Sequence, residues 1–380
     1  MRAQTRRPRC ANEALRSGLH STTSAVIQTH MHTHHQILIE DARCLTQVDD
    51  ASVHLIVTSP PYPMIPMWDD VFSQMSPAVS SALEDHDGPT AFEAMHNELD
   101  KVWTTCHRVL IDGGIIAVNI GDATRTLNQH FRLYPNHARI ISTMTALGMT
   151  VLPDILWRKP TNSPTKFMGS GMLPPGAYVT YEHEYILLFR KGNKRPFRTT
   201  DDKIRRRQSA YFWEERNHWF SDIWSDLPGT HQALSKDIRA RSAAYPFTLP
   251  HRLINMFSVY QDTVLDPFVG TGTTMLAAAV NARNSIGVDI LPSLGPRIAD
   301  TLSSAEDLAS QVIRSRLADH ANFVTDVQAS SRSLAHINAT LNTKVMTRQE
   351  TQMQLWCPIN PNWTTPHHLK LQHQPINIEQ

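Results

Sequence analysis

Two short motifs contain residue types that could bind a ligand and carry out chemistry. The first is D-P-F-V-G-T-G-T-T, from Asp266 to Thr274, and it stands between a strand-like and a helix-like segment. Its glycines let the backbone approach a ligand and adopt positive φ, and the following helix offers free N–H groups. Asp289 closes the next strand seventeen residues after Gly272, about where a Rossmann-like unit places the acid that hydrogen-bonds ribose hydroxyls. The motif therefore predicts a site for a nucleoside-bearing cofactor.

The glycine loop fits two common nucleotide sites poorly. Met275 occupies the place of the third glycine in a dinucleotide fingerprint, which argues against NAD. No G-K-S or G-K-T sequence follows the loop, which argues against an ATP phosphate loop. The remaining alternative to a cofactor site is a tight strand-to-helix turn without a ligand.

The second motif, T-S-P-P-Y from Thr58 to Tyr62, follows an apolar strand. Its two prolines fix φ at roughly −65° and Pro61 lacks a backbone N–H, so the loop is stiff and its carbonyls point outward. Ser59 contributes a hydroxyl and Tyr62 an aromatic ring, which together could hold a planar heterocycle with an exocyclic amine. A pentapeptide of this kind is often an ordinary turn, but its pairing with the glycine loop favours a functional site.

Hydrophobic periodicity predicts the elements that position these motifs. Strands are expected over residues 36–39, 53–57, 115–120, 151–157, 185–189, 263–265 and 285–288. Helices are expected over residues 92–109, 138–147, 249–257 and 273–280, with Gly113 and Gly114 ending the first. Strands alternate with helices at the spacing of βαβ units. This predicts an α/β fold with a largely parallel, doubly wound sheet that helices cover on both faces.

Taken together, the motifs resemble those of the amino-group DNA methyltransferases that use S-adenosyl-L-methionine. In that family the cofactor loop reads D-P-F-x-G-S/T-G-T-T and the catalytic motif reads S/D/N-P-P-Y, as at residues 266–274 and 59–62 here. The catalytic motif comes first along the chain, which resembles the circularly permuted β group, where a target-recognition region lies between the two motifs. The resemblance spans about residues 36 to 300 and includes W-R-K-P at 157–160, E-H-E at 182–184 and A-Y-P-F at 244–247.

The resemblance implies a Rossmann-like fold, S-adenosyl-L-methionine as cofactor, and a role for each matching residue. The implied catalytic residues are Ser59, Pro60, Pro61 and Tyr62. The implied cofactor-binding residues are Asp41, Pro246, Asp266, Pro267, Phe268, Gly270, Gly272, Thr273, Thr274 and Asp289. Two positions depart from the family pattern, because Glu40 replaces the usual glycine before Asp41 and Arg241-Ser242 replaces a frequent His-Pro.

The serine that leads the catalytic motif points to N4 of cytosine as the methyl acceptor, and N6 of adenine stays the alternative. An exocyclic amine is a poor nucleophile because its lone pair is delocalised into the ring. The Ser59 hydroxyl and the Pro60 carbonyl could favour a pyramidal nitrogen, and transfer from an activated methyl sulfonium then needs mainly alignment. No metal is required. Methylation at cytosine C5 is excluded because it needs a thiolate in a Pro-Cys sequence, which the chain lacks.

A base within duplex DNA must be flipped out before it can react, and Tyr62 is the expected stacking face for it. Residues 190–207 carry nine Lys and Arg against two Asp, and aromatic residues follow. This basic run is the expected DNA-facing region, with a solvated charged loop as its alternative. The expected DNA-binding residues are Arg195, Arg198, Lys203, Arg205, Arg206, Arg207 and Trp213.

These features predict a site-specific DNA methyltransferase that modifies N4 of cytosine in duplex DNA and is paired with a restriction endonuclease of the same specificity. The alternatives from other classes are a cofactor- and DNA-binding subunit without catalysis and a methyltransferase for RNA or small molecules. The expected domains are a disordered leader at 1–30, the catalytic half of the methyltransferase domain at 31–190, a target-recognition region at 191–240, the cofactor-binding half at 241–318, and a polar, poorly ordered tail at 319–380.

Composition excludes several other classes. The 380 residues hold 36 Lys and Arg against 35 Asp and Glu, so overall charge alone predicts no polyanionic partner. No run of eighteen apolar residues occurs, which excludes a membrane span, and the four cysteines are too far apart for a zinc or disulfide framework. A cytoplasmic location is expected, with a transit peptide in the Arg-rich first thirty residues as the alternative. His32, His34 and His35 are expected to be solvated rather than metal ligands.

Overall fold

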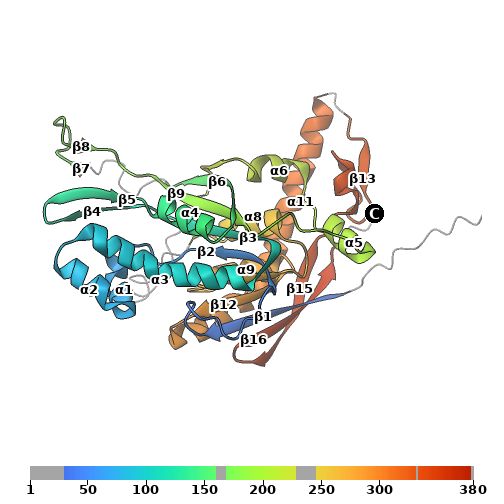
Figure 1. Ribbon diagram of the computed structural model, residues 1–380. Coiled ribbons are helices and arrows are strands. Elements are labelled where there is room, and N and C mark those ends of the chain that lie inside the picture. The colour runs from blue at the N-terminus through green and yellow to red at the C-terminus, as the bar shows by residue number, and fades with distance from the viewer. Residues whose placement is uncertain (1–29, 160–167, 228–244, 331–332, 378–380) are drawn as a thin grey trace, which may run out of the picture.

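A ten-stranded mixed sheet runs through the computed structural model, which describes residues 30–159, 168–227, 245–330 and 333–377 (Figure 1). The strands, in their order across the sheet, are β10 (Ile223–Trp224), β6 (Thr150–Arg158), β9 (His183–Arg190), β3 (Leu110–Ile120), β2 (Val53–Thr58), β11 (Thr263–Asp266), β12 (Asn284–Asp289), β1 (Met31–Ile39), β16 (His368–Pro375) and β15 (Trp356–Thr365). The central strands β3, β2, β11, β12 and β1 are parallel, and β9 and β16 border them as antiparallel strands.

Helices cover both faces of the parallel strands because successive side chains of a strand point to opposite sides. Ile56 of β2 packs in one core cluster with α3 (Gly88–Val109) and α4 (Asn136–Ala146). Its neighbours Leu55 and Val57 point to the opposite face and pack in a second core cluster with α8 (Thr248–Phe257) and α9 (Thr273–Val280). The predicted doubly wound α/β architecture is therefore confirmed.

The remaining elements surround this frame. The other helices in the described part of the chain are α1 (Asp69–Met75), α2 (Pro77–Glu84), α5 (Thr200–Gln208), α6 (Trp213–Trp219), α10 (Gly295–Ser303), α11 (Ala305–Ala329) and the short 3-10 helices η1 (Pro66–Trp68), η2 (Pro292–Leu294) and η3 (Arg348–Gln352). Three two-stranded hairpins are formed by β4 (Ala123–Leu127) with β5 (His130–Tyr134), β7 (Met168–Gly169) with β8 (Ala177–Tyr178), and β13 (His336–Asn338) with β14 (Thr343–Val345).

The elements next to both motifs lie where the sequence predicts them. β2 ends at Thr58, directly before the catalytic motif, and β11 ends at Asp266, the first residue of the glycine loop. α9 begins at Thr273 and β12 ends at Asp289. Because β2, β11 and β12 are adjacent and parallel, their carboxyl ends meet at one edge of the sheet, where ligands bind in open α/β folds.

The glycine pair after α3 does not separate helix from strand as predicted. α3 ends at Val109 and β3 begins at Leu110, so Gly113 and Gly114 lie inside the strand. Gly113 has a φ of +81°, and a Cβ there would lie 2.5 Å from the backbone nitrogen of Arg195. Glycine is needed at this position because another part of the chain approaches the strand closely.

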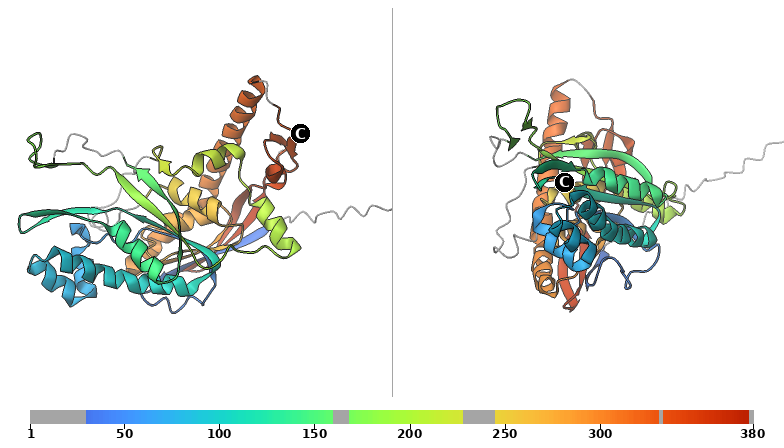
Figure 2. Two further views of the ribbon diagram at one scale, coloured as in Figure 1. Left: turned by 45° about the horizontal axis from the view of Figure 1, so that its top comes forward. Right: turned by 60° about the vertical axis from the view of Figure 1, so that its left-hand side comes forward.

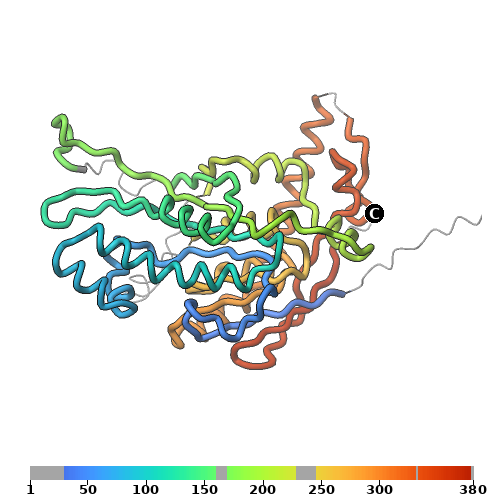
Figure 3. Tube along the Cα trace, viewed as in Figure 1, coloured from blue at the N-terminus to red at the C-terminus, as the bar shows by residue number. Residues whose placement is uncertain are grey.

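The polar C-terminal segment is not a poorly ordered tail. α11 continues to Ala329, and β15 and β16 form an antiparallel hairpin that extends the main sheet along β1, so the first and last strands of the described chain lie side by side (Figure 3). Leu369 and Leu371 are buried while the residues between and beside them are polar. The prediction was wrong because a strand with one buried face alternates apolar and polar residues and reads as polar by composition.

The histidines near the start of β1 differ from one another. His32 and His34 are exposed, as expected, but His35 is fully buried. Its ring nitrogens lie 2.8 Å from Ser285 Oγ and 2.9 Å from Thr33 Oγ1. Burial lowers the pKa of His35 well below its usual value, so this ring is a neutral, hydrogen-bonded core residue rather than a solvated one.

Two predicted regions fall partly outside the described residues. The leader at 1–30 lies outside them except for His30, and so do residues 228–240 of the expected target-recognition region. Among the helices that the structure describes, none is both long and apolar enough to cross a membrane.

Candidate active site

The loops that follow β1, β2, β11 and β12 line a cavity of about 1190 Å³ at the carboxyl edge of the parallel strands. The predicted site residues in its lining are Asp41, Ser59, Pro60, Pro61, Asp266, Pro267, Phe268, Gly270, Thr273 and Asp289. The other predicted cofactor and catalytic residues, Tyr62, Pro246, Gly272 and Thr274, are buried behind this lining. The fold therefore brings both motifs, about 200 residues apart in the sequence, to a single cavity.

Asp266 joins the two motifs. Its buried carboxylate accepts hydrogen bonds from the Thr58 hydroxyl at 2.7 Å and the Thr274 hydroxyl at 2.5 Å. The Phe268 N–H at 3.1 Å and the Tyr245 hydroxyl at 3.2 Å complete the set. Burial raises the pKa of Asp266, and these donors oppose that shift. The aspartate thus fixes the end of β2 against the end of β11 and sets the position of the loop that follows each.

Asp289 presents a carboxylate to the cavity from the end of β12. One oxygen accepts a hydrogen bond from the Leu291 N–H at 3.0 Å, and the other accepts one from the Gly270 N–H at 3.3 Å. Burial raises the pKa of Asp289, and the backbone donors oppose the shift. The residue therefore holds the glycine loop in place and leaves lone pairs that can accept hydroxyl groups of a ligand.

The two glycines of the loop are required for different reasons. Gly270 has a φ of +51°, and a Cβ at this position would meet no protein atom within 4 Å, because it would project into open space. Gly272 has a φ of +91° and stands at the start of α9, where a Cβ would come within 3.0 Å of Ile298. The first glycine leaves room beside the cavity, and the second permits the turn into the helix.

Asp41 is not a free acceptor. The Arg43 guanidinium donates to its carboxylate from Nε at 2.9 Å and from Nη2 at 2.6 Å, and this contact lowers the pKa of Asp41. Arg43 also reaches Glu98 Oε2 at 2.7 Å, and all three side chains line the cavity. The wall of the cavity at this point is an ion-paired cluster of which the sequence predicts only Asp41.

The catalytic motif forms a hydrogen-bonded chain. Ser59 lines the cavity and its hydroxyl donates to Tyr62 Oη at 3.0 Å. The Tyr62 hydroxyl donates in turn to Glu184 Oε2 at 2.9 Å. Tyr62 is only 8% exposed, and burial raises its pKa well above the usual value, so it stays a neutral hydroxyl. The predicted role of Tyr62 as an open stacking face does not match this position, because its ring is covered and its hydroxyl is engaged.

Two further polar groups hold Glu184 in this chain. Asn119 Nδ2 donates to Glu184 Oε2 at 2.7 Å and to Tyr62 Oη at 2.8 Å. Lys159 Nζ donates to Glu184 Oε1 at 2.5 Å. Lys159 and Glu184 fall in the W-R-K-P and E-H-E segments, but Glu184 is 122 residues from Tyr62. The sequence gives no signal that these side chains meet, so it predicts neither Lys159, Glu184 nor Asn119 as site residues.

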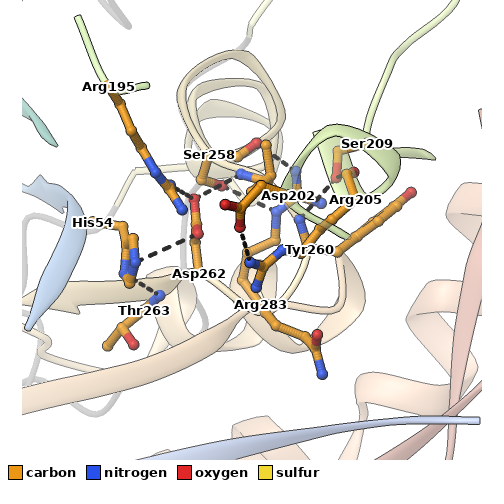
Figure 4. A network of polar contacts seen from close by, with 12 residues as sticks. His54, Arg195, Asp202, Arg205, Ser209, Ser258, Tyr260, Asp262, Thr263 and Arg283 are labelled. Atoms are coloured by element: carbon orange, nitrogen blue, oxygen red, sulfur yellow. Dashed lines mark hydrogen bonds and ion pairs between the residues drawn. The ribbon is translucent and has the colours of Figure 1, made fainter. Parts of the chain in front are cut away.

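The predicted DNA-binding residues lie elsewhere. α1 and α2, which follow the catalytic motif closely along the chain, lie at one end of the molecule, and α5, which carries four of the nine cations of the basic run, lies at the other (Figures 1 and 2). Arg195 contacts the buried Asp262 at 2.6 Å, beside the residue at which β11 begins (Figure 4). His54, the second residue of β2, lies 3.6 Å from the same carboxylate. These contacts place the run at the amino edge of the parallel strands.

The residues of the basic run differ in their partners. Arg205 pairs with Asp202 at 2.9 Å, as Figure 4 shows. Arg198, Lys203, Arg206 and Arg207 are exposed. Trp213 is 38% exposed, and its backbone N–H donates to Glu350 at 2.9 Å. Proximity in sequence therefore does not give these cations a shared role.

Comparison with known proteins agrees with the geometry. The model of the N6_N4_Mtase family, described as DNA methylase, matches residues 53–295 and so includes both motifs. The chain belongs to this family. It is 47% identical over 330 residues to the type II methyltransferase M.MthZI of Methanothermobacter thermautotrophicus, covering 86% of this chain and 92% of that protein. It is 48% identical over 281 residues to the type II methyltransferase M.MjaI of Methanocaldococcus jannaschii, covering 71% of this chain and 91% of that protein.

Solved structures show the same methyltransferase fold. This DNA methylase matches the Thermus thermophilus protein TTHA0409, crystallised with S-adenosyl-L-methionine, with a TM-score of 0.56 and 31% identity over 71% of this chain and 94% of that chain. It also matches the PvuII DNA methyltransferase (cytosine-N4-specific), with a TM-score of 0.51 and 16% identity. This match covers 74% of this chain and 93% of that chain. The second match concerns the fold alone. The Rossmann-like methyltransferase sheet predicted from the sequence is confirmed.

Proposed function

We propose that this DNA methylase transfers a methyl group from S-adenosyl-L-methionine to N4 of cytosine in duplex DNA, as the modification enzyme of a type II restriction system. One observation carries the proposal: Ser59 and Pro60 line the same cavity as Gly270 and Asp289, so a methyl donor and an exocyclic amine can meet there. The similarity to two archaeal type II methyltransferases supports the restriction context. The order of the motifs along the chain supports the permuted β group.

The cavity fits S-adenosyl-L-methionine, the cofactor of this enzyme. The open space at Gly270 lies beside the start of α9, where Thr271 and Thr273 line the cavity. The carboxylate of Asp289 is placed to accept ribose hydroxyls, since a carboxylate oxygen can accept a further bond besides the backbone N–H that it holds. The bound cofactor supplies a methyl group on a positively charged sulfur, which needs no further activation.

The target amine would be held by the catalytic motif. The Ser59 hydroxyl already donates to Tyr62, so its oxygen is free to accept an N–H of the amine. The Pro60 carbonyl offers a second acceptor on a stiff loop. Two acceptors at one amine favour a pyramidal nitrogen whose lone pair points at the methyl group. Serine at this position supports cytosine as the target.

Methyl transfer leaves a proton that the protein must remove. The nitrogen forms a bond to the methyl carbon, the bond from that carbon to sulfur breaks with its electron pair on sulfur, and the nitrogen then loses a proton. The amine proton passes to Ser59, the Ser59 proton to Tyr62, and the Tyr62 proton to Glu184, because each hydroxyl already donates to the next group along this line. Lys159 and Asn119 hold the Glu184 carboxylate in position for this step.

The identity of the product tests the proposal. Duplex DNA of mixed sequence is incubated with enzyme and S-adenosyl-L-methionine, digested to nucleosides and analysed by mass spectrometry, and the modified sites are sequenced. We expect N4-methylcytosine at a fixed site and resistance of that site to an endonuclease of the same specificity. N6-methyladenine as the sole product would overturn the cytosine assignment, and binding of cofactor and DNA without any product would favour a non-catalytic subunit.

A further inference from the structure

A second cavity, of about 920 Å³, lies at the amino edge of the parallel strands. It is formed by α5, the beginning of α6, the end of α8 and η3. Ser258 and Val259 line it just before β11 begins at Thr263, which places it at the edge opposite the catalytic motif. We call it the basic pocket because its lining includes Lys203, Arg206, Arg207, Arg216 and Arg348.

The cations of the basic pocket have no ion-pair partner within the part of the chain that the structure describes. None of the ion pairs among residues 30–159, 168–227, 245–330 and 333–377 includes any of these five cations. The neighbouring Arg195 and Arg205, which do not line the pocket, are paired with Asp262 and Asp202 (Figure 4). The fold thus separates paired arginines from unpaired ones within a single basic run.

Among the described residues that line the pocket, Glu350 is the only one with a carboxylate, and this carboxylate faces into the protein. It is 2% exposed and accepts hydrogen bonds from the Trp213 N–H at 2.9 Å and from the Thr347 N–H at 2.7 Å. A carboxylate held in this way fixes η3 against α6 and leaves Arg348 beside the pocket. Like charges gathered around a concave surface repel one another, and an anion in that space would relieve the repulsion.

Aromatic residues complete the pocket. Phe197, Tyr211 and Trp213 line it, and the Arg206 guanidinium stacks over the Phe197 ring at 4.8 Å. This stacking holds one cation in a fixed position without neutralising it. Arginine, lysine and tyrosine are among the side chains that contact DNA phosphates in protein–DNA complexes.

We propose that the basic pocket binds the phosphate backbone of a DNA segment separate from the segment that presents the target base. The proposal rests on the proposed function, since DNA is the polyanion on which this enzyme acts. The segment must be a separate one because the six residues of β2 put roughly 20 Å of protein between the pocket and the catalytic motif. The pocket would hold flanking or neighbouring DNA and so raise affinity without reading sequence.

A pair of double variants tests the proposal. Arg207→Gln with Arg348→Gln removes two charges from the pocket, and Arg314→Gln with Lys344→Gln removes two exposed charges outside it. Binding to a long duplex without the target site is measured by fluorescence anisotropy over a range of salt concentrations. Each phosphate contact adds about −0.9 to the slope of log affinity against log salt, so the pocket variant should lose up to about 1.8 of slope. Between about 50 and 200 mM salt, the DNA affinity of the parent should then fall about tenfold more than that of the pocket variant. The control variant should match the parent.

A second measurement separates this proposal from the proposed function. Methyl transfer is measured on a duplex just long enough to hold the target site and on one several helical turns longer. We expect the pocket variant to keep the parent's rate on the short duplex and to need more of the long duplex for half-maximal rate. If the parent methylates both duplexes and all three proteins have equal salt slopes, the DNA-binding role of the basic pocket is wrong and the proposed function stands. If the parent methylates neither duplex, the proposed function is wrong. If the pocket variant binds a free nucleotide more weakly than the parent but binds DNA equally well, the proposed DNA-binding role of the basic pocket is also wrong. The pocket would then bind a small phosphate ligand.

Discussion

The hydrogen-bonded chain from Ser59 to Glu184 predicts that Glu184→Gln slows methyl transfer without affecting the cofactor. Gln keeps the size of Glu and can still accept a hydrogen bond from Tyr62, but it cannot take up a proton. Glu184 does not line the cavity, so the dissociation constant of S-adenosyl-L-methionine should stay that of the parent. The loss should appear in kcat rather than in KM for DNA.

The structure sets the expected size of the effect. A positioned proton acceptor contributes about 10² to 10⁴-fold to the rate of the step that it serves. Glu184 acts through two hydroxyls, at 3.0 Å from Ser59 to Tyr62 and 2.9 Å from Tyr62 to itself, and solvent at the cavity can replace part of this route. We therefore expect a loss of about 10²-fold, at the lower end of that range. Glu184→Asp keeps a carboxylate and should restore part of the rate.

The control for this experiment is Glu182→Gln. Glu182 precedes the same strand, is 37% exposed on its side chain and pairs with Arg158 at 3.4 Å, away from Tyr62. Single-turnover transfer of a labelled methyl group to duplex DNA measures the chemical step, calorimetry measures cofactor affinity, and thermal unfolding checks that each variant is folded. If Glu184→Gln transfers methyl at the parent's rate, or if Glu184→Asp is as slow as Glu184→Gln, then Glu184 does not accept the proton.

Three further predictions follow from the same structure. Gly270→Val should weaken S-adenosyl-L-methionine binding in calorimetry because its side chain fills the open space beside the cavity. The control is Gly148→Val, because Gly148 also has a positive φ and open surroundings but lies away from the cavity. This variant carries similar strain and should bind the cofactor as tightly as the parent. Asp289→Asn should cost about 1.5 to 3 kcal/mol of cofactor affinity through the lost charge-assisted bond to ribose, with non-specific DNA binding retained as the check that the protein is folded. The free energy of unfolding should fall as the pH drops below about 6.5, because burial lowers the pKa of His251 and of His373 to about 3, so the unfolded chain binds these protons first. Each buried ring should cost up to about 2 kcal/mol at pH 5, and urea midpoints that are equal at neutral and mildly acidic pH would contradict this.

The C-terminal hairpin shows how composition can hide structure. Residues of β16 alternate between buried leucines and polar side chains, and a hairpin of this kind has too few apolar residues to be distinguished from a polar tail. Only its pairing with β1, more than 330 residues away, shows that it is part of the sheet. The leader, residues 228–240 and the last residues of the chain lie outside the described structure.

The sequence by itself determined the features that depend on local conformation. The ends of β2 and β11, the positive φ of Gly270 and Gly272, and the start of α9 follow from short runs of residues whose backbone preferences agree with one another. Parallel neighbouring strands then place both motifs at one edge, because their carboxyl ends must meet there. The part of the cavity lining that the two motifs, Asp41 and Asp289 supply could therefore be predicted without coordinates, whereas the part that α1 and α3 supply could not.

The tertiary structure alone decided which side chains meet across that frame. Arg43 engages Glu98, Glu184 engages Tyr62, and the basic run lies at the amino edge rather than beside Ser59. None of these outcomes has a local signal, because the energy of a buried hydrogen bond or ion pair depends on partners brought together by packing, over sequence separations that periodicity cannot report. A motif fixes where its own backbone turns, but the charge and burial of each side chain in it are set by distant parts of the chain.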